Sequence, residues 1–555
     1  MTKSAVRPQF RRSQTLGHDT RRGTSKEHRH QPTYSNHVMG RLPLDASRRL
    51  KYRPRMARSS LSTPGPSLSI LFVTPEMAPI AKAGGLADVA SALPLALRRR
   101  GHEVRVVMPL YGSIDRERYS VRPFHTPMGV WMGDRQEWCA VHEARAPGDI
   151  PVYLIEHSAF FDRFGFYHDQ SMQDYDDNAR RFGFLCRAAL QLCIDLGIRP
   201  DIVHGNDWQT ALTPAYLKLW HRGEPVFERT ASVLTLHNLA HQGIYRKTDY
   251  GYLGLGWENF RADRFETYDQ VNLLKGGIHY ADVITAVSPS FAREITTPFG
   301  GFGLAPYLSN RGGDLVGILN GIDTDVWNPE TDPHLPVRYG IKDRAGKREC
   351  KRELQRRFGL AEDEHVALIG AIGRFVHQKG YQLLSESIDG ILADMHAQFV
   401  ILGTGEHHLE HFFGTLPARY PGRVGSYIGF DDARAHLVEA GCDLFVMPSL
   451  FEPCGLNQMY SMRYGTVPVA HATGGLNDTV EAYNEADGTG TGFKFSPADP
   501  MALHFGVGLA ISTYYDRRHH FEGLVERGMS RDFSWTRSAQ QYEQAYRHAL
   551  RKNEG

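Results

Sequence analysis

The sequence is poor in cysteine, with six in 555 residues and none spaced as C-x-x-C. This pattern predicts a reducing, cytosol-like compartment. No apolar run approaches the roughly 20 residues that span a bilayer, and the N-terminus lacks the apolar core of a secretory signal. We therefore expect a cytoplasmic protein with no membrane partner.

Charge of one sign is not in excess over the whole chain, because 64 Lys and Arg face 62 Asp and Glu. A net charge of +2 gives no general case for a nucleic-acid partner. The sequence also lacks a P-loop, a zinc-protease helix and a Gly-x-Ser-x-Gly elbow. These absences argue against the nucleotide hydrolases, metalloproteases and serine hydrolases that such motifs mark.

The balanced total hides a basic N-terminal segment. Residues 1–60 carry fifteen Lys and Arg against three acids, and they show no apolar periodicity. We expect residues 1–67 to be a disordered tail, so that a chain starting near Ser67 keeps its activity. Three interpretations stay open: a plastid transit peptide, a flexible arm, or an extension upstream of a later start such as Met39 or Met56.

Short runs of Val, Ile and Leu alternate with helix-like segments along the rest of the chain. The first group of predicted strands is 69–73, 103–108, 152–155, 201–203, 232–236 and 283–287, and the second is 366–372, 399–402, 424–428, 444–447 and 467–470. Predicted helices include 86–99, closed by Gly101, and 179–196, closed by Gly197. Alternation of this kind predicts parallel, doubly wound α/β sheets. A polar, proline-bearing interval at 328–339 separates the groups, so the boundary falls near 320–345.

Two glycine-bearing stretches follow predicted strands and precede helices. They are Lys82-Ala83-Gly84-Gly85-Leu86 and Glu452-Pro453-Cys454-Gly455-Leu456. Glycine lets backbone N–H groups approach an anion closely, and a helix N-terminus adds partial positive charge. Two such loops in successive α/β halves predict a nucleotide sugar held between two domains.

Further polar residues follow other predicted strands. They lie in His204-Gly205-Asn206-Asp207-Trp208, in Thr235-Leu236-His237-Asn238, in Leu319-Asn320-Gly321-Ile322-Asp323 and in 373–380, which holds Arg374 and Lys379. Any one of them could be a helix cap or a turn. Their shared position at the carboxyl ends of strands predicts a binding site there.

Three other patterns have ordinary structural interpretations. Gly403-Thr404-Gly405 follows a strand, but His408 stands where the dinucleotide fingerprint needs glycine, so a turn is favoured. His407, His408 and His411 are helix-spaced without the companions of a metal site, which favours a solvated face. Cys186 and Cys193 are expected in the core.

Together these motifs carry a family resemblance. The stretches 82–89, 207–208, 237–240, 281–288, 320–323, 373–374, 378–380, 452–456 and 473–476 resemble bacterial glycogen synthases and plant starch synthases. The resemblance runs from about residue 68 to the C-terminus. Asn457 stands where threonine is frequent in that family, and the basic segment has no counterpart in the usual bacterial enzyme.

The resemblance implies an α/β fold of the GT-B class, with two Rossmann-like domains facing across a cleft. The implied domains are residues 68–320 on the acceptor side and 321–535 on the nucleotide-sugar side, with 536–555 as a helix that returns to the first domain. Closure about a hinge at 320–339 is then expected. No oligomeric state is predicted.

The resemblance also implies an activity, transfer of glucose from ADP-glucose to the non-reducing end of glycogen or another α-1,4-glucan with retention of configuration. Neither a cofactor nor a metal is expected. Another retaining GT-B transferase that uses UDP-glucose, or a catalytically silent glucan-binding protein, remains an alternative.

Site residues follow from the same resemblance. Arg374 and Lys379 are expected to neutralise the leaving phosphate, and Glu452 and His237 to face the sugar. Contacts to the diphosphate or the sugar are expected from Lys82, Gly84, Gly85, Asp207, Asn320, Cys454, Gly455, Leu456 and Asn457, with Asn238 and Trp208 in support. Cys454 itself is expected to be a structural thiol. No residue stands out as a covalent nucleophile, which favours a front-face substitution in which the leaving phosphate helps to deprotonate the acceptor hydroxyl.

Overall fold

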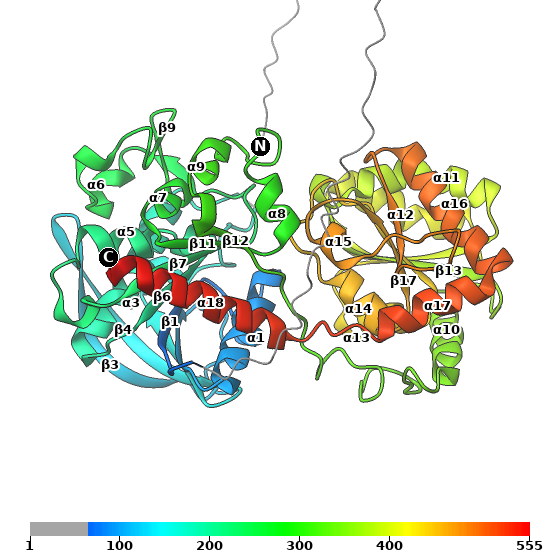
Figure 1. Ribbon diagram of the computed structural model, residues 1–555, viewed down its shortest axis with the longest axis horizontal. Helices are drawn as coiled ribbons and strands as arrows, with labels where there is room; N and C mark the ends of the chain where they lie inside the picture. Colours follow the sequence, from blue (N-terminus) through cyan, green and yellow to red (C-terminus); the bar gives the residue numbers. More distant parts are fainter. Residues whose placement is uncertain (1–64, 172, 555) are drawn as a thin grey trace, which may run out of the picture. The chain divides into compact units, whose positions relative to one another are not determined.

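The computed structural model describes residues 65–171 and 173–554. The tail expected at residues 1–67 therefore falls almost wholly outside the described residues. The described residues form two large sheets, one of nine strands and one of six. The strands of a third, three-stranded sheet fall within the part of the sequence that forms the nine-stranded sheet. Figure 1 shows both large sheets with helices on their faces.

The first sheet has the order β12-β11-β7-β6-β1-β2-β5-β4-β3. Its strands are β1 (Ser69–Val73), β2 (Glu103–Pro109), β3 (Arg122–Met132), β4 (Arg135–Ala146), β5 (Ile150–Glu156), β6 (Ile202–Asn206), β7 (Ala231–Leu236), β11 (Val283–Ala286) and β12 (Leu315–Gly317). The six strands predicted from apolar runs are all present, with small shifts at their ends. The central strands pair in parallel, as predicted.

One part of this sheet was not predicted. Strands β3 and β4 form an antiparallel hairpin, and β4 also runs antiparallel to β5, so the first sheet is mixed. The small sheet, β8 (Ile244–Arg246), β9 (Glu266–Thr267) and β10 (Gln270–Asn272), was missed as well. The small sheet packs beside a predicted site residue, because the ring centroid of Tyr245 in β8 lies 5.7 Å from that of Trp208.

Helices of the first half connect and cover its strands. They are α1 (Gly85–Arg99), α2 (Ser158–Phe161), α3 (Asn178–Leu196), α4 (Asp207–Thr210), α5 (Leu212–Leu219), α6 (Asp249–Leu253), α7 (Leu273–Tyr280), α8 (Pro289–Glu294) and α9 (Ala305–Ser309). Helix α3 ends at Gly197, whose φ of 64° is the left-handed C-cap that glycine favours. That stop was predicted from the sequence.

The second sheet has the order β15-β14-β13-β16-β17-β18, all in parallel. Its strands are β13 (Ala367–Phe375), β14 (Ala397–Gly405), β15 (Val424–Ile428), β16 (Leu444–Met447), β17 (Val467–His471) and β18 (Phe493–Phe495). The order reverses between β13 and β16, which is the doubly wound arrangement whose switch point binds ligands. Five of these strands were predicted.

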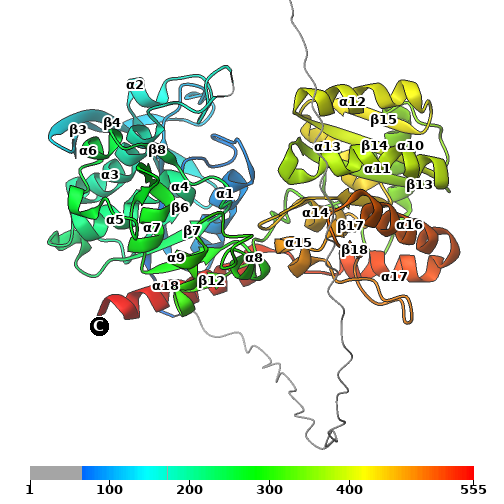
Figure 2. The same ribbon diagram turned by 90° about the horizontal axis from the view of Figure 1, so that it is seen from above.

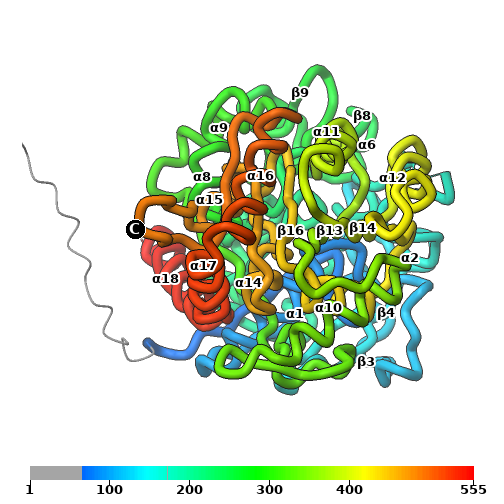
Figure 3. Tube along the Cα trace, turned by 90° about the vertical axis from the view of Figure 1, so that its right-hand side faces the viewer, coloured from blue at the N-terminus to red at the C-terminus, as the bar shows by residue number. Residues whose placement is uncertain are grey.

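Helices cover both faces of the second sheet. They are α10 (Ala345–Arg357), α11 (Tyr381–Asp394), α12 (His407–Arg419), α13 (Asp432–Gly441), α14 (Asn457–Arg463), α15 (Gly474–Thr479), α16 (Pro500–Asp516) and α17 (Arg518–Met529). Figures 1 and 3 show α11, α12 and α16 on one face, and α10, α13, α14 and α17 on the other. His407 and His408 point to solvent from α12, as predicted.

The last helix, α18 (Trp535–Glu554), packs against α1, β7 and β11 of the first sheet. Figures 1 and 2 show it, in red, beside those elements. Glu543 of α18 forms an ion pair of 2.5 Å with Arg100, and the Tyr546 hydroxyl lies 2.8 Å from Nδ1 of the buried His204. The chain thus returns to its first half after completing the second.

The chain passes from its first half to its second near residue 320 and returns near residue 534, and these two crossing segments are in contact. The N–H of Ile322 donates to the carbonyl of Phe533 over 2.8 Å, and Ile322 and Ser534 form a β-bridge. The Ser538 hydroxyl donates to the carbonyl of Leu319. The outgoing and returning segments are therefore fastened side by side where they leave the first sheet.

None of the helices within the described part of the chain is both long and apolar enough to cross a membrane. All six cysteines are buried and free.

Candidate functional site

The site begins at the carboxyl end of β1, where the chain turns toward α1. Buried Glu76 accepts hydrogen bonds from the N–H groups of Ala83 (2.5 Å) and Gly84 (3.1 Å). Burial raises the pKa of the Glu76 carboxyl to about 7 against the lowering effect of these two bonds. Glu76 thus holds the glycine loop in shape, and a diphosphate at this loop would either replace the carboxylate or use N–H groups further along it.

Lys82 precedes the two glycines and stays partly exposed. Its Nζ pairs with Asp88 Oδ1 over 2.8 Å, and its side chain is 45% exposed. Lys82 is therefore a partly exposed cation at the edge of the loop, close to where Gly84 caps α1.

Asp207 follows β6 and adopts a backbone φ of 57°, a left-handed conformation that is uncommon outside glycine. Its carboxylate accepts from the N–H groups of His237 (2.6 Å) and Asn238 (3.3 Å), which follow the neighbouring strand β7. Burial raises the pKa of Asp207 to about 7. The two bonds fix the ends of β6 and β7 relative to each other.

His237 is held in one tautomer. Asn206 donates from Nδ2 to the Val73 carbonyl over 3.0 Å, so its Oδ1 faces His237 Nε2 at 3.1 Å and accepts the proton there. Burial lowers the pKa of His237 to about 3. The imidazole is therefore neutral at physiological pH, and it can orient a hydroxyl without adding charge to the site.

Lys379 and Glu452 are the central ion pair that the second half of the chain contributes to the site. Lys379 Nζ lies 2.7 Å from Glu452 Oε2, and the Ser449 hydroxyl donates to the same oxygen over 3.0 Å. Lys379 ends a short 3-10 turn (His377–Lys379) after β13, while Glu452 follows β16. These are the adjacent strands of the topological switch point, so the pair lies where a doubly wound sheet binds ligands.

Gly380 makes this placement of Lys379 possible. Its φ is 67°, and a Cβ there would lie 1.9 Å from the carbonyl oxygen of Pro448. The turn after Lys379 therefore packs directly on the backbone that leads to Glu452.

Arg374 and Gln378 extend the site toward the first sheet. Arg374 is exposed. The pKa of His241 is lowered first by the burial of its own ring and second by the positive charge of Arg374. Gln378 Oε1 accepts from Asn238 Nδ2 over 3.3 Å. The loops after β7 and β13 are thus in contact.

The loop at 452–457 is braced by a second glycine pair. A Cβ at Gly474 would lie 1.9 Å from the carbonyl oxygen of Glu452, and one at Gly475 would lie 2.1 Å from that of Cys454. Burial raises the pKa of the Cys454 thiol to about 12, so it stays protonated and unreactive. Asn457, the first residue of α14, donates from Nδ2 to the carbonyl of Ile372 over 3.1 Å.

The two glycine loops found in the sequence face each other. A Cβ at Gly85 would lie 3.8 Å from Cδ1 of Leu456. Nearby, the Ser288 hydroxyl donates to the carbonyl of Pro453 over 2.6 Å, and the N–H of Gly474 donates to Glu294 over 2.8 Å. Predicted residues from both halves of the chain are therefore brought together.

Two further predicted residues are buried, as Asp207 and Glu452 are. Trp208 is 6% exposed and packs edge-on against Phe182, so it supports the site from within the core. Asn320 is also buried, and its Oδ1 has no hydrogen-bond partner in residues 65–171 and 173–554. An unpaired buried carbonyl beside the 452–457 loop is a ready acceptor for a ligand hydroxyl.

Sequence reasoning missed Glu76 and Ser449 as parts of the site, and it gave no role to Gln378 within the predicted stretch 373–380. Glu76 follows β1 as Asp207 follows β6, so the rule that singled out polar residues at strand ends applies to it as well. Ser449 follows β16 in the same way.

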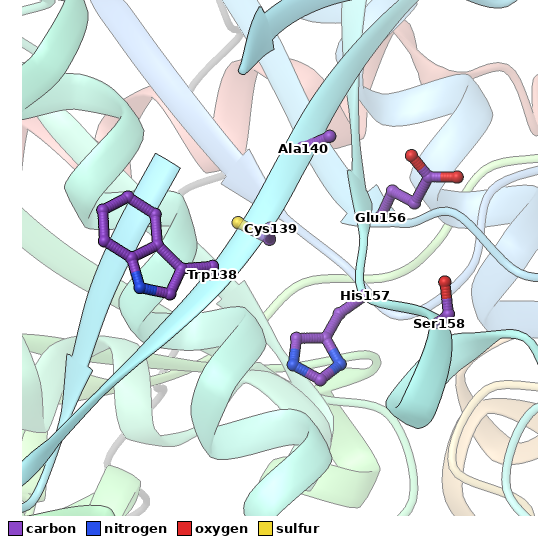
Figure 4. Close-up of a pocket in the computed structure, with 6 residues that line it drawn as sticks. All are labelled: Trp138, Cys139, Ala140, Glu156, His157 and Ser158. Carbon is purple, nitrogen blue, oxygen red and sulfur yellow. The ribbon is translucent and has the colours of Figure 1, made fainter. Parts of the chain in front are cut away.

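A separate pocket of about 290 Å³ lies on the first sheet. Figure 4 shows its lining, which comes from β4, β5 and the start of α2: Trp138, Cys139, Ala140, Glu156, His157 and Ser158. No predicted site residue lines it.

Comparison with known proteins gives a consistent result over most of the chain. The family described as "Starch synthase catalytic domain" matches residues 69–310, and "Glycosyl transferases group 1" matches residues 352–522. Glycogen synthase 1 of Geobacter sulfurreducens is 47% identical over 88% of this chain and 97% of its own length. Glycogen synthase of Anaeromyxobacter sp. (strain Fw109-5) is 49% identical over 86% and 99%.

Solved structures agree with the sequence relatives. The catalytic domain of Starch Synthase IV from Arabidopsis thaliana, bound to ADP and acarbose, superposes with a TM-score of 0.81 at 36% identity, covering 88% of this chain and all of that one. Sucrose-phosphate synthase from Thermosynechococcus elongatus shares the fold, with a TM-score of 0.55 at 16% identity over 87% of this chain and all of its own.

Proposed function

Since this chain belongs to the glycogen synthase and starch synthase family of GT-B glycosyltransferases, we propose that it lengthens an α-1,4-glucan with glucose from ADP-glucose. The observation that carries the proposal is the Lys379–Glu452 pair at the switch point of the second sheet, with Arg374 near the end of β13, the strand that precedes Lys379. The donor binds at these residues, and the glucan end approaches from Asp207 and His237 of the first sheet.

Each charged group has a part in the transfer. As the bond from glucose C1 to the diphosphate breaks, negative charge grows on the distal phosphate, and Lys379 and Arg374 stabilise it. Positive charge grows at C1, where the Glu452 carboxylate opposes it. The acceptor hydroxyl then bonds to C1 on the face that the phosphate leaves, and its proton passes to a phosphate oxygen.

Two of the groups that the first half contributes are neutral. His237 is uncharged because burial lowers its pKa to about 3, so it binds a sugar hydroxyl without competing with Lys379 for the phosphate. The Asn320 Oδ1 accepts another hydroxyl. Lys82, Gly85, Leu456 and Asn457 surround the diphosphate.

The division into domains at 320–321 and 535–536, and a cytoplasmic location, stay predictions. We place the hinge at the fastened crossings, Ile322 beside Ser534, because relative motion of the halves must pass through these two segments.

The test is an assay with labelled ADP-glucose and UDP-glucose in parallel, each with a glycogen primer. Incorporation of label into polymer from ADP-glucose, with much less from UDP-glucose, is expected. Preference for UDP-glucose would overturn the assignment of ADP-glucose as the donor. A small disaccharide product would overturn the assignment of a glucan as the acceptor. Absence of transfer from either donor would favour the alternative of a catalytically silent glucan-binding protein.

A further inference from the structure

We propose that this chain binds a divalent transition-metal ion, of the Zn²⁺ class, at His334, Asp432 and His436. These side chains bring one possible ligand atom each to within 4.8 Å of one another, and they are the one such group of three among the described residues. Two imidazoles and a carboxylate are ligands that Zn²⁺ accepts, with a fourth position left for water.

The three residues come from two segments. Asp432 opens α13 and His436 lies four residues later, so both fall on one face of the helix. His334 lies in the segment that leads from the first sheet to the second, and its ring centroid is 4.8 Å from that of His436. A bound ion would therefore join this crossing to α13.

Asp332 orients the His436 ring, as the outer carboxylate of a metal site does. It is fully buried, and its Oδ2 lies 2.7 Å from Nδ1 of His436. Its Oδ1 accepts the backbone N–H of His334 over 2.8 Å, which fixes the chain at that residue. Because Nδ1 of His436 is occupied, Nε2 is the nitrogen left to face an ion.

Aromatic neighbours hold the His436 ring in place. Trp327 stacks on it with centroids 3.9 Å apart and planes 7° from parallel. The Tyr464 hydroxyl donates to Asp332 Oδ2 over 2.6 Å, which leaves that carboxylate fully engaged. His436 is only 2% exposed, whereas His334 and Asp432 reach solvent and give an ion its entry path. The His436 ring is thus held in place before an ion binds, so binding loses conformational entropy only at the side chains of His334 and Asp432.

This site shares no residue with the set around Lys379 and Glu452, although the charge of Asp432 reaches Asp88, the partner of Lys82. The test reads ion binding and not transfer, so the proposal stands or falls independently of the proposed function. The ion fastens the crossing segment to the second sheet and raises the stability of that half.

The experiment uses the full, tag-free chain after metal removal, titrated with Zn²⁺ and, for its visible spectrum, with Co²⁺. Wild type is expected to bind one ion tightly, to melt at a higher temperature with Zn²⁺, and to give the intense Co²⁺ absorption of a four-coordinate N/O site. His334→Ala and Asp432→Asn each remove a ligand from an exposed position, so both are expected to fold normally and to weaken binding about tenfold or more.

His365→Ala is the matched control, because His365 is an exposed histidine of the same half, 87% exposed and outside the cluster. It should bind as wild type does. Equal affinity and equal Co²⁺ spectra in wild type, His334→Ala and Asp432→Asn would overturn the proposal, and would assign binding to other histidines such as the four in residues 1–60. A wild-type chain that binds neither ion would overturn it too.

Discussion

Lys379 Nζ and Glu452 Oε2 lie 2.7 Å apart, with Glu452 only 6% exposed and Lys379 25% exposed. The pair joins the group proposed to stabilise the leaving phosphate to the group proposed to face C1. Each therefore holds the other's side chain in position before any substrate contact is made, and a change at either one is felt at both.

Lys379→Ala is expected to lower kcat about a hundredfold, which corresponds to about 3 kcal/mol of lost transition-state stabilisation. It should also lower the free energy of unfolding by about 1 to 3 kcal/mol, because a buried carboxylate loses its cation. Urea melts and initial rates measure the two effects. The double variant with Glu452→Gln should recover much of the stability and none of the rate; additive losses in stability would show that the pair is not coupled.

Glu452→Gln keeps the shape of the side chain and removes its charge. Turnover is expected to collapse while ADP affinity is retained, because the diphosphate contacts lie on other residues. Calorimetry with ADP, beside the transfer assay, separates the two. Loss of ADP binding in step with turnover would place Glu452 in the nucleotide site instead.

Arg374→Ala is expected to lower kcat about a hundredfold with a change in unfolding free energy within about 0.5 kcal/mol, since the side chain is exposed. Arg374→Lys should recover only part of the rate, because a point charge replaces a planar fork of donors. Arg348→Ala, an exposed arginine on α10, is the control and should stay active. Near-normal turnover in Arg374→Ala would remove this residue from the site.

Asp207→Asn tests the buried carboxyl. The pKa of Asp207 is raised from 3.8 to about 7, so the folded chain holds a proton there that the unfolded chain releases above pH 4. This proton's contribution to stability is complete below pH 4 and is lost as the pH rises toward 7. Asn accepts the same N–H bonds and tolerates the left-handed backbone, but it does not titrate.

The stability of Asp207→Asn relative to wild type should therefore rise between pH 5 and 7, by an amount on the order of 1 kcal/mol per pH unit, and level off above. Urea melts at several pH values measure it. Parallel pH profiles for the two proteins would contradict a raised pKa at this position.

Gly380→Ala is expected to destabilise the second half and abolish transfer. A Cβ at this residue would lie 1.9 Å from the Pro448 carbonyl oxygen, and the backbone φ of 67° is unfavourable for alanine. Gly390→Ala, on the exposed side of α11, meets nothing closer than 3.6 Å and should stabilise the chain by about 0.5 to 1 kcal/mol. Thermal melts compare them, and an active, stable Gly380→Ala would mean that the turn after Lys379 can relax.

The strands that apolar runs predict are those buried on both faces, such as β1 and β16, and their bounds agree with the structure. β3 was missed because its exposed stretch, Arg122 to Pro127, carries two prolines and no clear alternation. Its partner β4 lies between β5 and β3 and buries Cys139, Val141, Ala144 and Ala146. It was missed because these short side chains alternate with charged and polar ones and form no run of Val, Ile or Leu.

The candidate site was found because parallel strands bring their carboxyl ends to one edge. That rule marked the stretches that hold Asp207, His237, Arg374 and Lys379, and the family resemblance singled out these residues and Glu452. In the structure Asp207 contacts His237, Lys379 contacts Glu452, and the loops after β7 and β13 meet. The strand-end rule could not predict the hydrogen bonds within the site, such as those from the Gly84 N–H to Glu76 and from Ser449 to Glu452. These bonds depend on how the loops fold against one another.

Helix α18 has a consequence for how the protein is made. The first sheet is complete in sequence at Gly317, yet the face that holds His204 is covered by Tyr546 near the end of the chain. At about 5 to 20 residues per second, a ribosome needs on the order of ten seconds or more to add the intervening segment. During that interval the first half is a nascent domain with an uncovered apolar face, and it reaches its final packing only when the last helix leaves the exit tunnel.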